Sequence, residues 1–322
     1  MKQLLQNKLL NTIIKILIFG GLMFVLYRQL FSNEKIEIAY HHFVLNFQGS
    51  YLLLTAVIVL MLLNWTIESV KWKLLIDKLH PVSWLEAIEG ILFGVTFSLF
   101  TPSRIGEFGG RIFALNTDRK EAIVSTLLGS VAQMVVNLSF GALGLLLYSL
   151  AHNKMDNYVL VAFLFIYGWM VIAIHFVYYN IDVVSAKFSN FSVFKKVYKY
   201  IHIIDLYSNK EFFILEILSA FRYGIYCLQF AFLLQFFGIS IPFLTALKVV
   251  AAMFFVQTIN PFNIALLDFG FRGNVAAYFL SPFTGDAIAI IATTVLLWFI
   301  NLIIPAIIGG IAALRFTFFK EE

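Results

Sequence analysis

Two charged motifs in this sequence share one pattern. Glu107-Phe-Gly-Gly-Arg111 and Asp268-Phe-Gly-Phe-Arg272 both read acid, Phe, Gly, any residue, Arg, and they lie half of the 322-residue length apart. An acid and an arginine four positions apart lie on one face of a helix. Each pair therefore has two possible roles. It is either an ion pair that fixes the local backbone, or a binding site whose arginine holds a phosphate while the acid meets a cationic headgroup or carries a proton.

Each motif follows a short apolar segment that ends in a polar residue and a proline, Thr101-Pro102 or Asn260-Pro261. Proline suits the first position of a helix, and threonine or asparagine suits the capping position before it. A helix that begins inside a membrane directs free N–H groups into a cavity and favours an anion there. Arg104 would add a full positive charge to this first turn. The backbone freedom for such breaks is expected from five glycines: Gly106, Gly109, Gly110, Gly270 and Gly273.

Other polar side chains interrupt the apolar segments. Gln133 and Asn137 share a helical face, and we expect them to pack between helices by hydrogen bonding. Arg222 lies seven positions before Gln229, and Lys248 lies in the second short segment. Because an unpaired guanidinium in lipid is costly, Arg222 is a candidate substrate-binding residue of a cavity, with helix packing as the alternative.

The composition places these residues in a membrane protein. Apolar residues make up 61% of the chain and charged residues only 13%, whereas a soluble domain carries roughly 25% charge. The net charge of +5 is expected on loops that face anionic lipid, not on a nucleic-acid site. The single cysteine, Cys227, excludes an intrachain disulfide, and no catalytic or metal-binding motif is present. We therefore expect no catalytic residue, no metal and no cofactor.

Apolar runs of about 20 residues are long enough to cross a bilayer as helices. Six runs meet that length: Leu9 to Phe31, Tyr51 to about Val70, Ala122 to Leu150, Tyr158 to Tyr179, Phe212 to Phe237, and Asp286 to Leu314. The first run follows Lys2 and Lys8 and is too long for a signal peptide, so we expect an anchor helix there. Two further runs, Glu86 to Phe100 and Phe243 to Ile259, are shorter and lead into the charged motifs.

The positive-inside rule decides whether the two short runs cross the membrane or return. If both return as re-entrant hairpins, most lysines and arginines of the loops, including the five lysines between Lys187 and Lys210, lie on the inner side. If both cross the membrane instead, more of these lysines and arginines lie on the outer side than on the inner side. We therefore predict an all-α polytopic protein of the inner membrane with six full spans, both termini cytoplasmic, and two hairpins that enter from opposite faces. Residues 1–322 then form one transmembrane domain, an inverted repeat with halves at about 1–161 and 162–322.

The chain resembles a known family in these residues. Thr101-Pro-Ser-Arg-Ile-Gly-Glu-Phe-Gly-Gly-Arg111, the preceding Lys71-Trp72, and the second Asp-Phe-Gly-x-Arg hairpin are similar to the membrane domain of lysylphosphatidylglycerol synthases and its stand-alone flippase-like relatives. The resemblance implies a lipid flippase, and in the fused synthases this domain moves an aminoacylated phosphatidylglycerol to the outer leaflet. By position, the resemblance assigns that role to six residues: Arg104, Gly106, Glu107, Arg111, Asp268 and Arg272.

Two departures from the family pattern shape the expected activity. Only a few residues follow the last span, so we expect no aminoacyl transfer by this chain. The second hairpin reads Asn260-Pro-Phe-Asn263 and lacks a counterpart of Arg104. The expected substrate is an anionic or aminoacylated phospholipid, or a polyprenyl-phosphate-linked lipid, and the expected partners are this lipid and a separate lipid-modifying enzyme or glycosyltransferase, not nucleic acid. The alternatives are a proton-coupled transporter of a small soluble anion, and a scaffold that transports nothing.

Overall fold

The computed structural model describes residue 20 and residues 34–99, 101, 105–113, 115, 119–152, 156–181, 183, 201–259 and 265–315. Within these ranges the chain forms helices and no strand. The elements are α2 (Glu34–Ile76), α3 (Trp84–Ser98), α4 (Gly106–Phe113), α5 (Arg119–His152), α6 (Asn157–Tyr179), η2 (Ile201–Leu206), α9 (Asn209–Phe236), α10 (Phe243–Thr258), α11 (Ala265–Leu280), α12 (Ala287–Trp298), η3 (Phe299–Ile303) and α13 (Ile304–Arg315).

Five segments of the described chain are long and apolar enough to cross a membrane. They are Ser50–Ile76, Glu121–Ala151, Tyr158–Tyr179, Asn209–Phe236 and Ala287–Leu314. Each contains most of one predicted run, which confirms five of the six, and the sixth, Leu9 to Phe31, lies outside the described residues. The first of the five begins at a kink, because Ser50 interrupts α2 with non-helical torsions. The last combines α12, η3 and α13, with a turn of π-helix at η3.

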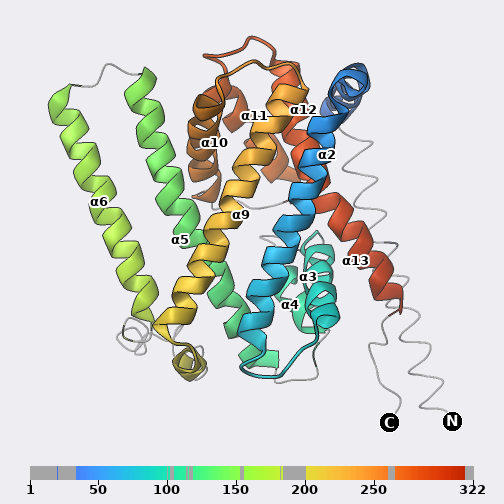
Figure 1. The fold of residues 1–322 in the computed structure, drawn as a ribbon, viewed down its shortest axis with the longest axis vertical. Helices are drawn as coiled ribbons and strands as arrows, with labels where there is room; N and C mark the ends of the chain where they lie inside the picture. The colour runs from blue at the N-terminus through green and yellow to red at the C-terminus, as the bar shows by residue number, and fades with distance from the viewer. Residues whose placement is uncertain are drawn as a thin grey trace.

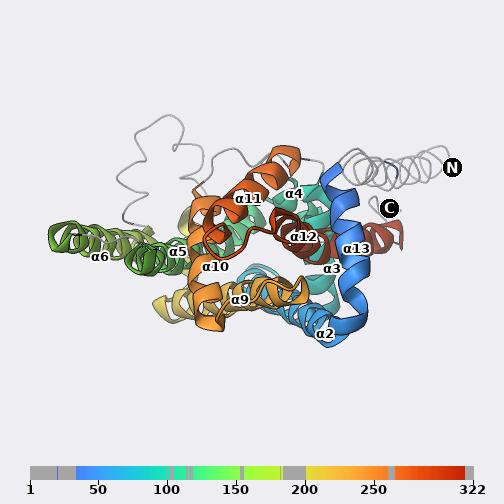
Figure 2. The ribbon, with the colours of Figure 1, turned by 90° about the horizontal axis from the view of Figure 1, so that it is seen from above.

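Two pairs of shorter helices lie at opposite ends of the bundle. Figure 1 shows α3 and α4 side by side in its lower half, and α10 and α11 in its upper half. Figure 2, viewed from above, places these pairs among α2, α5, α9 and α12, the last being the first part of the Ala287–Leu314 span. None of these helices is long enough to cross a bilayer by itself, since α10 and α11 have 16 residues each and α4 has 8.

The helices contact one another in matched pairs. The first short pair packs through α3 against α13, and the second packs through α10 against α5. The long helices that precede the short pairs, α2 and α9, pack on each other. In addition, α2 packs on α12 and α9 packs on α5. The main contacts are therefore preserved when each helix of the first half is replaced by its counterpart in the second: α2 by α9, α3 by α10, α4 by α11, and α5 by the α12–α13 span.

Close approach between helices depends on glycine. A Cβ atom on Gly110 of α4 would lie 2.6 Å from the carbonyl oxygen of Phe93 and 2.8 Å from the Cα of Gly94 in α3. Likewise, a Cβ on Gly144 of α5 would lie 2.3 Å from the Cβ of Ala251 in α10. Small residues allow membrane helices to gain dispersion contacts without a hydrophobic driving force. These glycines therefore fix the two short pairs in place.

Helix α6 differs from the others because none of its best apolar window is buried in the protein. Figure 1 shows it at the edge of the bundle, beside α5. An apolar helix with an exposed surface is stable when lipid covers it.

The charged motifs lie inside helices, not in loops. Glu107 to Arg111 belongs to α4, and Asp268 to Arg272 belongs to α11. Gly109 and Gly270 are therefore helical residues and do not break the helices, and Gly238 is the one described glycine with a positive φ. The cost of a helical glycine, about 1 kcal/mol relative to alanine, is small beside the packing that Gly110 allows.

The start of α4 also differs from the expectation. This helix begins at Gly106, and Thr101 Oγ1 accepts a hydrogen bond from the Gly106 N–H at 2.6 Å. Thr101 thus has the predicted capping role, but for a helix that starts later than Pro102. The predicted positions Pro102, Arg104, Asn260 and Pro261 lie outside the described residues.

Candidate functional site

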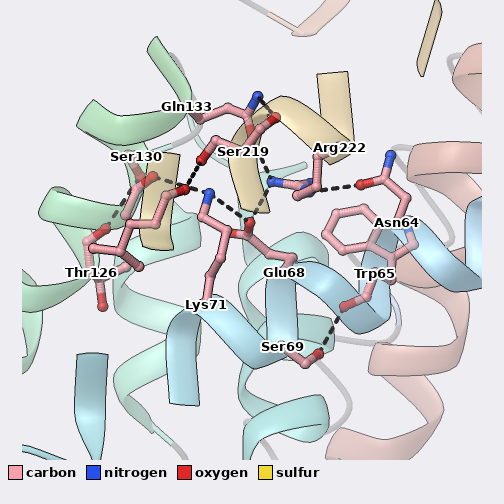
Figure 3. A network of polar contacts seen from close by, with 12 residues as sticks. Asn64, Trp65, Glu68, Ser69, Lys71, Thr126, Ser130, Gln133, Ser219 and Arg222 are labelled. Atoms are coloured by element: carbon pink, nitrogen blue, oxygen red, sulfur yellow. Dashed lines mark hydrogen bonds and ion pairs between the residues drawn. The ribbon is translucent and has the colours of Figure 1, made fainter. Parts of the chain in front are cut away.

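A buried carboxylate, Glu68 of α2, joins three helices. Its side chain is only 8% exposed, and it contacts three cations: Arg111 of α4 at 2.8 Å, Lys71 of its own helix at 3.4 Å, and Arg222 of α9. Lys71 also donates a hydrogen bond to the carbonyl of Gly129 in α5, at 3.2 Å. Figure 3 shows Lys71 and Arg222 directed toward Glu68 from opposite sides. This carboxylate therefore ties α2 to α4 and α9.

Arg111 is shared between two acids. It forms an ion pair with Glu107, four positions earlier on the same helix, and a second one with Glu68. The prediction that Glu107 and Arg111 lie on one face is confirmed. The Arg111 side chain is 4% exposed and packs against Gly94 of α3, where a Cβ would lie 2.7 Å from Arg111 Cγ. Arg111 thus contacts α3 as well as Glu107 of its own helix, and it attaches α4 to α2.

Arg222 lies at the centre of a polar network between α2, α5 and α9. Its Nε donates to Asn64 Oδ1 at 2.7 Å, and its Nη1 donates to Glu68 and, at 3.3 Å, to Gln133 Oε1. Its guanidinium lies 5.8 Å from the centre of the Trp65 ring, a cation–π distance. The network is shown in Figure 3. Arg222 is therefore paired as well as placed in the interior.

The described ions of this cluster do not balance. Glu68 and Glu107 supply two negative charges, against three formal positive charges on Lys71, Arg111 and Arg222. All three cations are buried. Charged groups inside a membrane protein are costly unless paired, and among the described residues this cluster carries one formal positive charge in excess.

A cavity of about 470 Å³ opens beside this cluster. It is lined by Glu107 of the first motif and Arg272 of the second, together with Glu68 and Arg222. Arg272 Nη1 donates to Gln257 Oε1 of α10 at 3.4 Å. The remaining polar lining includes Ser98, Ser130, Gln133, Asn137, Gln257, Thr258, Thr294 and Asn301. The two motifs, half a chain apart in sequence, therefore meet at one site.

Part of the cavity wall is aromatic and aliphatic. Its apolar lining comprises Trp65, Leu99, Met134, Tyr223, Tyr226, Phe230, Phe254, Leu297, Trp298 and Leu302. A cavity lined by both charged and aromatic side chains suits a ligand that has a polar group and a hydrocarbon part.

The other predicted site residues fall in three groups. Gln133 and Asn137 are hydrogen bonded to each other at 3.0 Å and also line the cavity. Gln229 is fully buried, donates to the Val57 carbonyl at 2.9 Å and does not line the cavity, so it packs helices. Lys248 of α10 does not line it either. The Asp268 side chain lies outside the described part of the chain.

Glu68, which forms ion pairs with three cations, was not among the residues predicted from the sequence. Its signal was present, because an acid inside the apolar run from Tyr51 to Val70 is a functional candidate by default. Asn64 and Asn301 carried the same kind of signal. The π-helical turn that brings Asn301 to the cavity had no recognisable pattern in the sequence.

The fold and this site define a multi-pass integral membrane protein with a charged internal cavity. Residues 12–309 match the family described as the lysylphosphatidylglycerol synthase TM region, and the chain belongs to this family. No curated protein and no solved structure matched the chain.

Proposed function

We propose that this protein is a lipid flippase, which moves a phospholipid headgroup across the membrane through the cavity while the acyl chains remain in the bilayer. The observation that carries the proposal is the meeting of Glu107 and Arg272, one from each motif, at a cavity with an excess of positive charge and an aromatic wall. Membership of a family of lipid-related membrane domains supports it.

The proposed architecture is an inverted repeat with two re-entrant hairpins, α3–α4 and α10–α11. The exchange symmetry of the helix contacts supports this arrangement, as does the position of the two pairs at opposite ends of the bundle. In transporters of this kind, the substrate binds near the midplane, between the repeats, and the two halves move around it. Here α2 and α9 form one of the contacts between the halves, beside those of α5 with α10 and α3 with α13, and Glu68 and Arg222 tie α2 to α9.

The chemistry of the lining suggests how the residues divide the work. Arg222 and Arg272 suit the phosphate of a lipid, because guanidinium groups form strong charge-assisted hydrogen bonds with phosphate oxygens. Glu107 suits the cationic part of an aminoacylated headgroup, or a proton. The proposed substrate is an anionic or aminoacylated phospholipid or a polyprenyl-phosphate-linked lipid. Transport without synthesis is proposed, with a separate enzyme supplying any modified lipid.

A second candidate function is the proton-coupled transport of a small soluble anion. The excess of formal positive charge around Glu68 favours it equally, because that charge attracts any oxyanion. The aromatic and aliphatic side chains in the lining favour the lipid.

The proposal is tested with purified protein in liposomes that carry a phospholipid with a fluorescent headgroup. A membrane-impermeant reductant bleaches the label in the outer leaflet, so the loss of signal from the inner leaflet reports translocation. We expect the parent protein to translocate lipid, and the double variants Glu107→Gln/Arg111→Gln and Asp268→Asn/Arg272→Gln to be folded but inactive. Gln229→Met, away from the cavity, is the control.

Uptake of a labelled soluble anion without lipid movement would favour the second candidate. Lipid movement by the double variants at the parent rate would show that the motifs are structural.

A further inference from the structure

Hydrogen-bond donors without acceptors surround Arg222. Its Nη2 makes no hydrogen bond to any described residue, while Nε and Nη1 are engaged. Asn64 Nδ2 and Trp65 Nε1 are buried and also lack a partner in the described structure. The orientation of the Asn64 amide is set by its Oδ1, which accepts from Arg222 Nε. Two buried donors on adjacent residues of α2, Asn64 Nδ2 and Trp65 Nε1, therefore remain unmatched.

A buried donor without an acceptor costs about 1–3 kcal/mol, so two of them on residues that contact the Arg222 guanidinium indicate that an acceptor belongs there. Arg222 and Trp65 line the cavity, which gives a ligand access to this position. The excess formal positive charge of the Glu68 cluster makes the missing acceptor an anion. A phosphate or phosphodiester group has several oxygens that accept hydrogen bonds, which suits a set of separate donors.

We propose that Arg222 and Trp65 bind one phosphate or phosphodiester group from the cavity, that Asn64 positions the Arg222 guanidinium, and that Glu68 competes with this group for Arg222. Glu68 also lines the cavity and contacts Arg222 Nη1, so it acts as an internal anion when no ligand is bound. A bound ligand draws Arg222 away from Glu68. Binding thereby weakens the link between α2 and α9, one of the helix contacts between the halves.

The same charges limit what the site accepts. Glu68 and Glu107 repel a second negative charge, so the site selects a single anionic group, such as the phosphodiester of a phospholipid, over a dianion. The choice of a lipid as the source of this group rests on the proposed function. A free phosphate ion carries the same chemistry, and the experiment separates the two sources.

Binding is measured by titration calorimetry on the full chain in detergent, with no transport step. The probes are dihexanoylphosphatidylglycerol, which carries one phosphodiester, and inorganic phosphate. The main variant is Glu68→Gln with Lys71→Met, because this pair leaves the formal charge of the cluster unchanged while removing the competing carboxylate. We expect it to bind the short lipid about tenfold more tightly than the parent. Arg222→Gln should weaken binding by about tenfold or more.

If Arg222→Gln does not fold, Arg222→Lys replaces it, because lysine keeps the positive charge of the network. Arg222→Lys should still bind the short lipid more weakly than the parent, because lysine lacks the Nε–H and one further N–H donor of arginine. Gln229→Met, on the same helix and outside the cavity, should bind as the parent does. Tight binding of the lipid but not of phosphate assigns a lipid phosphodiester, and displacement of the lipid by phosphate assigns a free anion.

Folded Arg222 variants that bind like the parent would overturn the site, and a folded Glu68→Gln/Lys71→Met variant that binds no better would overturn the competition. Because no transport is measured, these outcomes are independent of the flippase assay. Binding without translocation would leave the site standing and refute the proposed function.

Discussion

Removing Arg111 should destabilise the protein more than removing Glu107. Arg111 is 4% exposed and lies between two carboxylates, so Arg111→Gln leaves Glu68 and Glu107 without the cation they share. Loss of one partner from a buried ion pair costs about 3–5 kcal/mol. Because Glu68 keeps Lys71 and Arg222, we expect a cost of about 3 kcal/mol, at the low end of this range. Glu107 is 20% exposed, so Glu107→Gln should cost less.

The double variant provides the decisive comparison. In Glu107→Gln/Arg111→Gln one acid and one cation are removed together, so its cost should be smaller than the sum of the two single costs by about 1–3 kcal/mol. The free energy of unfolding is measured in detergent micelles by denaturant titration, with tryptophan fluorescence as the readout. A cost below about 1 kcal/mol for Arg111→Gln, or single costs that simply add, would refute the role of Arg111 as a shared structural cation.

Three further expectations concern packing, topology and chemistry. Gly110→Ala should lower the melting temperature, since the added Cβ would lie 2.6 Å from the Phe93 carbonyl oxygen. Gly109→Ala should leave the melting temperature unchanged or raise it slightly, because no atom lies within 4 Å of its Cβ position. Equal effects of the two variants would contradict the close α3–α4 contact. In a Cys227→Ala background, a cysteine at Asp156 should react with an impermeant reagent only from outside and one at Lys210 only from the cytoplasmic side, and the reverse result would exclude the predicted topology. Purified protein supplied with phosphatidylglycerol and aminoacyl-tRNA should yield no aminoacylated lipid, and a product detected by mass spectrometry would overturn transport without synthesis.

The long spans were predictable from the sequence because a bilayer sets the length of an apolar helix. The positions at which these spans end were harder to predict. The second predicted span stopped near Val70, yet the helix continues to Ile76 with Lys71 fully buried, because Glu68 and the Gly129 carbonyl satisfy its charge. Hydropathy counts a lysine as the end of a span, and only the fold shows its partners.

The site was predictable in part. The structure places two residues of the repeated motif, Glu107 and Arg272, and the separately predicted Arg222 along one cavity. Their role in binding a substrate stays a prediction. The glycines of α4 were misinterpreted as helix breaks, whereas Gly106 and Gly110 lie inside the helix and allow it to approach the backbone of α3. The role of Glu68 could not be derived from spacing alone, since its partners Arg111 and Arg222 come from α4 and α9.

The central claim is that a lipid headgroup passes through the cavity beside Arg222, and blocking that cavity tests it most directly. Ser130 of α5 lines the cavity, so Ser130→Trp should fill it without removing any ion pair. Leu127→Trp places the same side chain on the same helix at an exposed position outside the cavity lining. In the liposome assay, Ser130→Trp should abolish movement of headgroup-labelled lipid, while Leu127→Trp should match the parent rate. Movement at the parent rate by folded Ser130→Trp protein would contradict the claim.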